Sequence, residues 1–197
     1  MTMVLMWLQI GTGFTGALTL VFLLRAAARR FGHIPSMAAF FSPKGGCQEA
    51  ILREIKAARR EILVQAYSFT SEPLTMALIE AKKRGVHVEV LLDHSNEKEK
   101  YSDLHLFLEH GLPPLIDANH PIAHNKVMII DKKTIVTGSY NFTNQAENEN
   151  AENMLILKHH PELVNSYRQA FLAHKAHCKP AQIKAPAEAP AAHRKAA

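Results

Sequence analysis

The chain has 197 residues, a formal net charge of +5 and two cysteines. Two cysteines exclude a disulfide framework, and they leave open whether Cys47 and Cys178, near opposite ends of the folded part, form a single pair. The positive charge favours an anionic partner only modestly, because part of it lies in the N-terminal linker and the C-terminal tail.

The N-terminal segment, residues 3–24, contains no charged residue. It is long enough to cross a bilayer as a helix, which takes about twenty residues. Arg25, Arg29 and Arg30 follow it, and the positive-inside rule then puts the rest of the chain on the cytoplasmic side. A cleaved export signal is the alternative, although such signals begin with basic residues and none precedes Met3. We therefore expect a transmembrane or signal-anchor segment at 1–24, a basic linker at 25–39, a folded domain at 40–178 and a disordered Ala/Pro/Lys-rich tail at 179–197.

The folded domain alternates between predicted helices and strands. Helices are expected at residues 46–60, 71–84, 102–110 and 161–176, and strands at 62–67, 86–92, 127–130, 134–137 and 153–157. The last helix is amphipathic, and its inward face is expected to comprise Leu163, Tyr167, Ala170 and Phe171. This alternation predicts an α/β fold with a mixed, mostly parallel β-sheet that is covered by helices on both faces.

Polar residues lie at the ends of the last three predicted strands. In chain order they are His124, Lys126, Asp131, Ser139, Asn141 and Glu152. Residues i and i+2 of a strand point to the same side, so His124 and Lys126 project together, as do Ser139 and Asn141. An imidazole, an ammonium, a hydroxyl, an amide and a carboxylate at neighbouring strand ends can attack a phosphodiester and hold its negative charge. A chance pair of His and Lys in a solvated loop is the alternative, and the order and spacing of the whole set argue against it.

This spacing, His-x-Lys-(x)4-Asp followed by Gly-Ser-x-Asn, resembles the signature of the phospholipase D superfamily. The resemblance extends over roughly residues 40–175, a single-domain length, and includes residues 41–43, 66–70 and 81–86. It is nearest to the small bacterial phospholipase D-like endonucleases, which carry one signature per chain. The chain is also similar to mitochondrial cardiolipin hydrolase, or Zucchini, which has an N-terminal membrane segment. The Cys/His metal-binding insert of that enzyme is not expected here, because only Cys47 stands at that place.

The resemblance implies a role for most residues of the set. His124 would be the nucleophile, Lys126 a fixed charge on the phosphate oxygens, and Glu152 the carboxylate that orients His124. Ser139 and Asn141 would donate hydrogen bonds to the same oxygens. Asp131 ends its strand on the opposite face from Lys126, so a structural turn or salt-bridge role stands beside direct chemistry. Glu147 and Glu149 compete with Glu152, but they fall in a polar run, whereas Glu152 begins a rigid strand.

Displacement at phosphorus needs a nucleophile on one side and an acid on the other, and one imidazole cannot occupy both positions. The chain carries one signature and no detectable internal repeat, so the second His124 is expected from a second copy of the chain in a C2 homodimer. The alternative acids are His94, His105 and His120, none of which lies in a repeated motif.

No cofactor and no metal are expected, because Lys126 and two imidazoles supply the charge that a divalent ion would. His174, His177 and Cys178 could in principle bind zinc. The four-ligand spacing of a structural zinc site is missing, so we expect a solvated helix end there.

Three functions remain open. A nuclease acting on DNA or RNA is favoured by the basic clusters at 82–84 and 132–133 and by the lack of a long apolar loop that would accept acyl chains. A membrane-anchored phospholipase D acting on anionic phospholipid is the second, because the N-terminal segment would hold the domain near lipid headgroups. A catalytically silent nucleic-acid-binding protein is the third. The expected location is the bacterial inner membrane, and its side stays open because bacterial relatives are often exported.

Overall fold

The computed structural model describes residues 19–27, 34–99 and 102–181. Residues 19–27 are helical, and the remainder of the predicted membrane segment lies outside the described residues, as do residues 28–33 of the linker and 182–197 of the tail. Within the described ranges, no helix has both the length and the apolar character needed to cross a bilayer. The membrane segment at 1–24 therefore stays a prediction.

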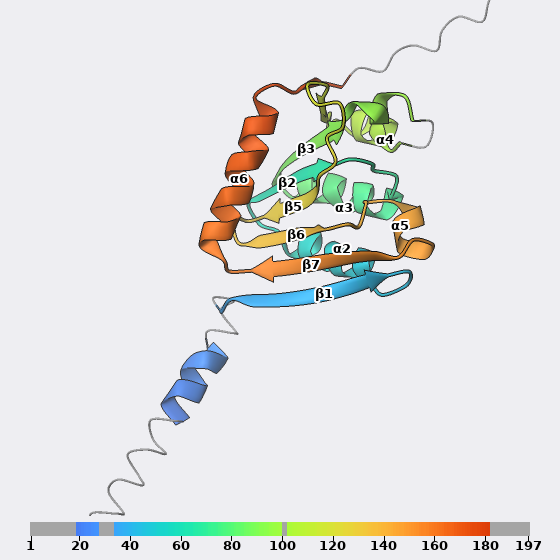
Figure 1. Cartoon of the computed structure of the whole chain (residues 1–197). Helices are drawn as coiled ribbons and strands as arrows, with labels where there is room; N and C mark the ends of the chain where they lie inside the picture. The colour runs from blue at the N-terminus through green and yellow to red at the C-terminus, as the bar shows by residue number, and fades with distance from the viewer. Residues whose placement is uncertain (1–18, 28–33, 100–101, 182–197) are drawn as a thin grey trace, which may run out of the picture.

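From residue 34 onward the chain alternates between strands and helices (Figure 1). The strands are β1 (Ser36–Ser42), β2 (Glu61–Ala66), β3 (His87–Asp93), β4 (Leu115–Asp117), β5 (Lys126–Ile130), β6 (Thr134–Gly138), β7 (Glu152–Lys158) and β8 (Lys179–Pro180). The helices are α2 (Cys47–Ala57), α3 (Glu72–Lys83), the short 3₁₀ helix η1 (His94–Glu97), α4 (Leu104–Glu109), α5 (Asn144–Asn148) and α6 (Pro161–Lys175).

The strands of the described chain form one mixed sheet in the order β1-β7-β6-β5-β2-β3-β4-β8. Among the described strands, only the pairs β2–β3 and β3–β4 are parallel. The mixed sheet is confirmed, and the expectation that it is mostly parallel is wrong. A parallel crossover takes about a dozen residues or more, whereas β5 turns directly into β6 through Asp131 and Lys132, both with positive φ (53° and 57°). β1, which the sequence pattern did not indicate, adds a further antiparallel strand beside β7.

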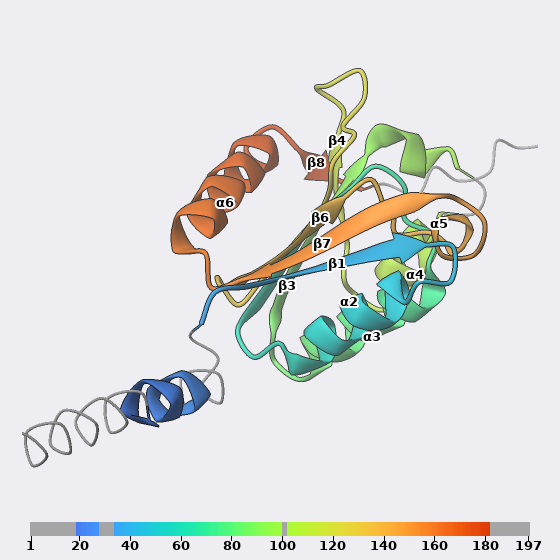
Figure 2. The same cartoon turned by 60° about the horizontal axis from the view of Figure 1, so that its bottom comes forward.

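Helices cover both faces of the sheet, as predicted. Figure 2 shows α2 and α3 on one face and α6 on the other. On α6 the buried side chains are Val164 and Phe171, whereas Leu163 and Ala170 are exposed. The predicted inward face of this helix was therefore partly wrong. The helix carries apolar residues at adjacent positions, so two faces fit a 3.6-residue period, and packing on the sheet selects one of them.

The two cysteines belong to the hydrophobic layers on opposite faces of the sheet. Cys47 is fully buried in the layer beneath α2 and α3, and Cys178 packs against the layer beneath α6. Both thiols are free. Burial, followed by the nearby charge of Glu147, raises the pKa of Cys47 to about 11. The two cysteines therefore do not pair, and Cys47 is an inert core residue.

Candidate active site

The antiparallel centre of the sheet brings several strand ends to one edge. β5 runs antiparallel to β2, so Lys126 at its start pairs with Ala66 at the end of β2. Glu152, at the start of β7, pairs with Ser42 at the end of β1. β6 ends at the same edge, because it runs antiparallel to both β5 and β7. Five of the six residues predicted from the sequence therefore lie at this edge, namely His124, Lys126, Ser139, Asn141 and Glu152.

Lys126 is a buried cation beside an exposed imidazole. Its residue is only 7% exposed, and its Nζ donates to the carbonyl oxygen of His124 at 3.2 Å. Burial lowers the pKa of Lys126, and the negative charge of Glu152 acts in the opposite direction. A charge with little water around it acts strongly on a phosphate oxygen placed next to it. Lys126 therefore suits the role of phosphate ligand.

Tyr67 contacts both members of this pair. It lies in the stretch 66–70 that carries the family resemblance, but the sequence assigned it no role. Its ring lies edge-on to the ring of His124, with centroids 4.6 Å apart, and the Nζ of Lys126 lies 5.3 Å from its centroid. Tyr67 directly follows Ala66, whose pairing with Lys126 puts the tyrosine beside the signature. The position of Tyr67 thus follows from the strand register, which the fold reveals and the sequence alone does not.

Glu152 and Ser139 form a second hydrogen-bonded group at this edge. Ser139 Oγ donates to Glu152 at 2.5 Å, and Asn150 Nδ2 donates to the other carboxylate oxygen at 3.1 Å. In turn, the backbone N–H of Asn153 donates to Ser139 Oγ at 3.0 Å. Among the described residues of this single chain, no hydrogen bond joins Glu152 to His124. The role of Glu152 as the group that orients His124 therefore stays a prediction.

Gly138 sets the spacing between these residues. A Cβ at this position would lie 2.3 Å from the carbonyl oxygen of Asn153, and the backbone φ is +152°. β6 and β7 can therefore approach closely only with glycine here. Just beyond it, Asn141 has a buried side-chain oxygen with no hydrogen-bond partner in the described structure. This oxygen can accept a hydrogen bond from a ligand, because buried polar atoms normally have a partner, and the amide N–H of Asn141 is the group that can donate to phosphate oxygens.

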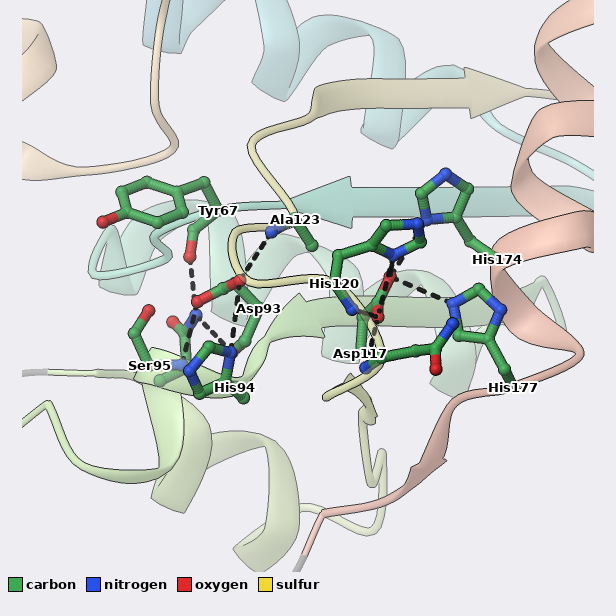
Figure 3. Close-up of polar contacts among 11 residues, drawn as sticks. Tyr67, Asp93, His94, Ser95, Asp117, His120, Ala123, His174 and His177 are labelled. Carbon is green, nitrogen blue, oxygen red and sulfur yellow. Dashed lines mark hydrogen bonds and ion pairs between the residues drawn. The ribbon is translucent and has the colours of Figure 1, made fainter.

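The loop before His124 is held by Asp93, a second residue that the sequence pattern did not single out. The Asp93 carboxylate accepts hydrogen bonds from the backbone N–H of Ala123 at 2.7 Å and of Ser95 at 2.9 Å (Figure 3). Burial raises the pKa of Asp93, but these hydrogen bonds outweigh it, so the pKa lies below its ordinary value. Asp93 thus positions the residue that directly precedes His124.

Asp131 lies at the far end of β5 from His124. Its carboxylate accepts hydrogen bonds from the backbone N–H groups of Arg59, Arg60 and Glu61, at 2.7 to 3.1 Å. These donors form the turn between α2 and β2. The structure therefore supports the structural alternative for Asp131 and separates it from the other five residues.

Replacing Asp131 with alanine is expected to lower the free energy of unfolding by about 2–4 kcal/mol, because three backbone donors lose a charged acceptor. The measurement is chemical denaturation followed by circular dichroism. Asp131→Asn is the matched control, since asparagine keeps one accepting oxygen and tolerates positive φ. Turnover per folded molecule should stay within about twofold of wild type in both variants. A large loss of turnover in folded protein would instead indicate that Asp131 takes part in the reaction.

The competing carboxylates are placed differently from Glu152. Glu147 accepts hydrogen bonds from Tyr140 Oη and from the backbone N–H of Gln48, both at 2.9 Å. Glu147 therefore connects the loop between β6 and α5, which contains Tyr140, to the first turn of α2. Glu149 is exposed.

A polar cavity of about 470 Å³ adjoins Tyr67. Its lining residues are Tyr67, Ser68, His94, Ser95, Lys98 and Glu99. His94 is thus the alternative acid that shares a cavity with a neighbour of His124. His105 is exposed on α4, and His120 belongs to a different cluster, described below. A second cavity, of about 520 Å³, lies around Asp131 at the other end of β5.

The predicted solvated helix end at His174 and His177 is wrong. Their side chains are 24% and 29% exposed, and both contact the carboxylate of Asp117. Cys178 is the third residue considered for zinc, and its thiol donates a hydrogen bond from Sγ to the carbonyl oxygen of His174 at 3.2 Å. The contact of the two histidines with Asp117 could not be predicted from the sequence, because Asp117 is far from them along the chain.

Residues 51–175 match the protein family described as cardiolipin synthase, PLD-like domain. The chain is 46% identical over 136 residues to phospholipase D of Rickettsia bellii, an alignment that covers 69% of this chain and 67% of that protein. It is 32% identical over 135 residues to human mitochondrial cardiolipin hydrolase, covering 68% of this chain and 54% of that protein. Among solved structures, the phospholipase D family member Nuc from Salmonella typhimurium aligns with a TM-score of 0.72 and 34% identity, over 76% of this chain and 99% of Nuc.

Proposed function

The chain belongs to the phospholipase D superfamily and is a hydrolase of phosphodiester bonds, and we propose that it is a metal-independent endonuclease that cleaves DNA or RNA through a phosphohistidine intermediate. The observation that carries this proposal is the pairing of an exposed imidazole, His124, with a buried cation, Lys126, at one sheet edge. This pair offers a nucleophile and a charge for the phosphate oxygens without a metal ion.

In the proposed reaction a ring nitrogen of His124 attacks phosphorus, a P–N bond forms, and the P–O bond to the leaving group breaks. The leaving oxygen takes a proton from a second imidazole on the opposite side. That imidazole then removes a proton from water, which attacks phosphorus and releases His124. Lys126 and Asn141 hold the phosphate oxygens as negative charge develops on them. Ser139, whose hydroxyl donates to Glu152 in the free chain, would join them by turning its hydrogen to the phosphate.

We infer that the second imidazole is His124 of a partner subunit in a symmetric homodimer. His124 is exposed, and in the described chain its ring contacts Tyr67 and makes no hydrogen bond. The other side of the ring is thus open to a substrate and a second subunit. His94 is the alternative acid within one chain, because it lines the cavity next to Tyr67.

The choice of nucleic acid as substrate rests on the polar cavity beside Tyr67. Its lining consists of hydroxyl, imidazole, ammonium and carboxylate side chains with one phenol ring, which suits a sugar-phosphate chain better than acyl chains. The net charge of +5 favours the same polyanion.

A phospholipid headgroup is the second candidate substrate. Ile122, two residues before His124, is 61% exposed, and an apolar side chain there could contact lipid. The names phospholipase D and mitochondrial cardiolipin hydrolase of the relatives point the same way. The predicted N-terminal segment would tether either activity to the bacterial inner membrane.

The decisive experiment incubates the purified full chain with labelled single-stranded DNA, duplex DNA, RNA and anionic phospholipid vesicles, each with and without EDTA. We expect cleavage of nucleic acid, with at least about half of the rate retained in EDTA, because the proposed chemistry uses no metal. Circular dichroism checks that the protein stays folded. Loss of activity in folded protein that magnesium restores would contradict the mechanism. Hydrolysis of phospholipid alone would establish the second candidate, and binding without any cleavage would indicate a silent binding protein.

Glu152→Gln is expected to lower kcat by about 10- to 100-fold while KM changes by less than about threefold. Glutamine keeps an oxygen that can accept from Ser139 but loses the charge that would stabilise the His124 cation. Steady-state kinetics measure both constants. Glu149→Gln, at an exposed position nearby, is the matched control. Unchanged kcat in Glu152→Gln would move the orienting role to Glu147 or Glu149.

A further inference from the structure

Four polar side chains from separate parts of the chain meet at the β4 edge of the sheet. They are Asp117 at the end of β4, His120 in the loop that follows, His174 in the last turn of α6 and His177 in the turn beyond it (Figure 3). One potential ligand atom from each lies within 4.8 Å of every other. None of the four belongs to the strand-end set around His124.

The distances match those between ligands of a small tetrahedral ion. Asp117 Oδ2 lies 3.0 Å from His120 Nδ1, 3.0 Å from His174 Nδ1 and 3.3 Å from His177 Nε2. Four ligands placed about 2.0–2.1 Å from a zinc ion are about 3.3 Å apart from one another. Small shifts of the imidazole rings would complete such a shell.

Hydrogen bonding within the cluster does not account for it fully. The backbone N–H groups of Asn119 and His120 donate to Asp117 Oδ1, at 3.1 and 3.3 Å, and this leaves Oδ2 directed at three rings. His177 Nε2 is buried and lies 3.3 Å from that oxygen, but it makes no hydrogen bond of acceptable geometry. A buried ring nitrogen normally makes a hydrogen bond or binds a metal ion, and a cation at the centre of the cluster would satisfy this one.

The carboxylate is suited to hold a cation. Asp117 is 1% exposed, and its side chain has no lysine or arginine as a hydrogen-bond or ion-pair partner in the described chain. A buried carboxylate without a lysine or arginine partner is a suitable place for a bound cation.

We propose that Asp117, His120, His174 and His177 form a binding site for a divalent transition-metal ion, and that zinc fits it best. Imidazole nitrogen and carboxylate oxygen are common zinc ligands, and four protein ligands fill a tetrahedral shell and leave no position for a substrate. The ion therefore has a structural role.

The position of the site defines that role. The loop between β4 and β5 contains both His120 and His124, and Asp93 already holds Ala123, the residue before His124. An ion shared by His120 and the end of α6 would fix the same loop from the other side. It would also fix the C-terminal end of α6, next to β8. The ion thus positions the segment that carries His124 and takes no part in the reaction there.

The test is the metal content of the full chain, purified from zinc-supplemented cells with a tag other than polyhistidine and analysed by inductively coupled plasma mass spectrometry. We expect about one zinc ion per chain in the wild type, and at least about a tenfold lower zinc affinity in His120→Ala and in His177→Ala. His110→Gln is the matched control, because His110 is exposed and lies outside the cluster. It should bind zinc as the wild type does.

His120→Ala is expected to fold even if His177→Ala does not, because the His120 side chain is 42% exposed and its loss creates no cavity in the core. The metal measurement can then still be made on a folded cluster variant. Circular dichroism verifies that each variant is folded. Cobalt added to the metal-free chain should give the visible absorption of a tetrahedral rather than an octahedral Co²⁺ complex. Equal zinc affinity in the wild type and both cluster variants would overturn the proposal, as would a wild type that binds no zinc.

Zinc should also raise the Tm of the metal-free chain by about 10 °C, and slow hydrogen exchange at residues 118–123. Neither change should occur in His120→Ala. These readouts involve no substrate, so they stand apart from the endonuclease assay. Measuring zinc in the EDTA-treated activity sample separates the two proposals: activity that is lost with the zinc and regained with zinc, but not with magnesium, supports the structural ion and leaves the metal-independent chemistry intact.

Discussion

Replacing His124 with alanine is expected to lower turnover by at least about 10⁴-fold, with the fold and substrate binding retained. The residue is exposed and makes no hydrogen bond through its ring, so its loss leaves no unsatisfied partner in the described structure. The effect must therefore come from the chemistry and not from unfolding. Thermal denaturation and substrate affinity, measured beside kcat, check this distinction.

His105→Ala is the matched control, because His105 is also an exposed histidine and lies on α4, outside the strand-end set. It should keep wild-type turnover. His94→Ala examines the alternative acid, and a loss comparable to that of His124→Ala would place both partners of the reaction in one chain. Substantial turnover in His124→Ala would exclude it as the nucleophile.

The same experiment has a positive readout. Wild-type enzyme quenched during turnover should carry an acid-labile phosphoryl adduct, and mass spectrometry should locate it on His124. Glu152→Gln should accumulate less of this adduct if Glu152 stabilises the His124 cation. A reaction with no adduct at any time point would favour direct attack by water.

The local part of the site could be predicted from the sequence because strands alternate with a period of two. His124 and Lys126, like Ser139 and Asn141, share a side for that reason alone, and the fold brings the two pairs to one edge. Tyr67 and Asp93 cannot be placed by such an argument. Their places depend on which strands are neighbours, and a pattern along the chain carries no information on strand order.

The wider fold shows the same limit. Asp93 holds the loop before His124 through a hydrogen bond to Ala123 that joins positions thirty residues apart in the chain. The metal-binding candidate joins Asp117 to His177 over a still longer separation, and its ligands come from a strand, a loop, a helix end and a turn. Zinc sites can be recognised in a sequence when their ligands are closely spaced along the chain, and the four residues of this cluster are widely separated. The prediction of strand direction was wrong for a related reason. The alternation of strands and helices favoured parallel pairs, whereas the turn at Asp131 and Lys132 forces β5 and β6 to be antiparallel.

The second large effect is expected from mixing subunits. If two copies of His124 face each other across a dimer axis, each catalytic site needs both imidazoles. A heterodimer of wild-type and His124→Ala subunits would then be inactive or limited to a single turnover. Activity should fall with roughly the square of the wild-type fraction, so an equal mixture should retain about a quarter of the wild-type activity.

The measurement uses full-length chains that carry two different tags, co-expressed so that subunits assemble at random, with heterodimers purified through both tags in turn. Wild type mixed with His105→Ala is the control and should keep full activity at every ratio. The geometry behind this expectation is the exposed His124 ring, whose ring contact in the described chain is with Tyr67. A linear fall, which would leave about half of the activity in an equal mixture, means that each chain holds a complete site. His94, which lines the cavity beside Tyr67, would then be the first candidate for the acid.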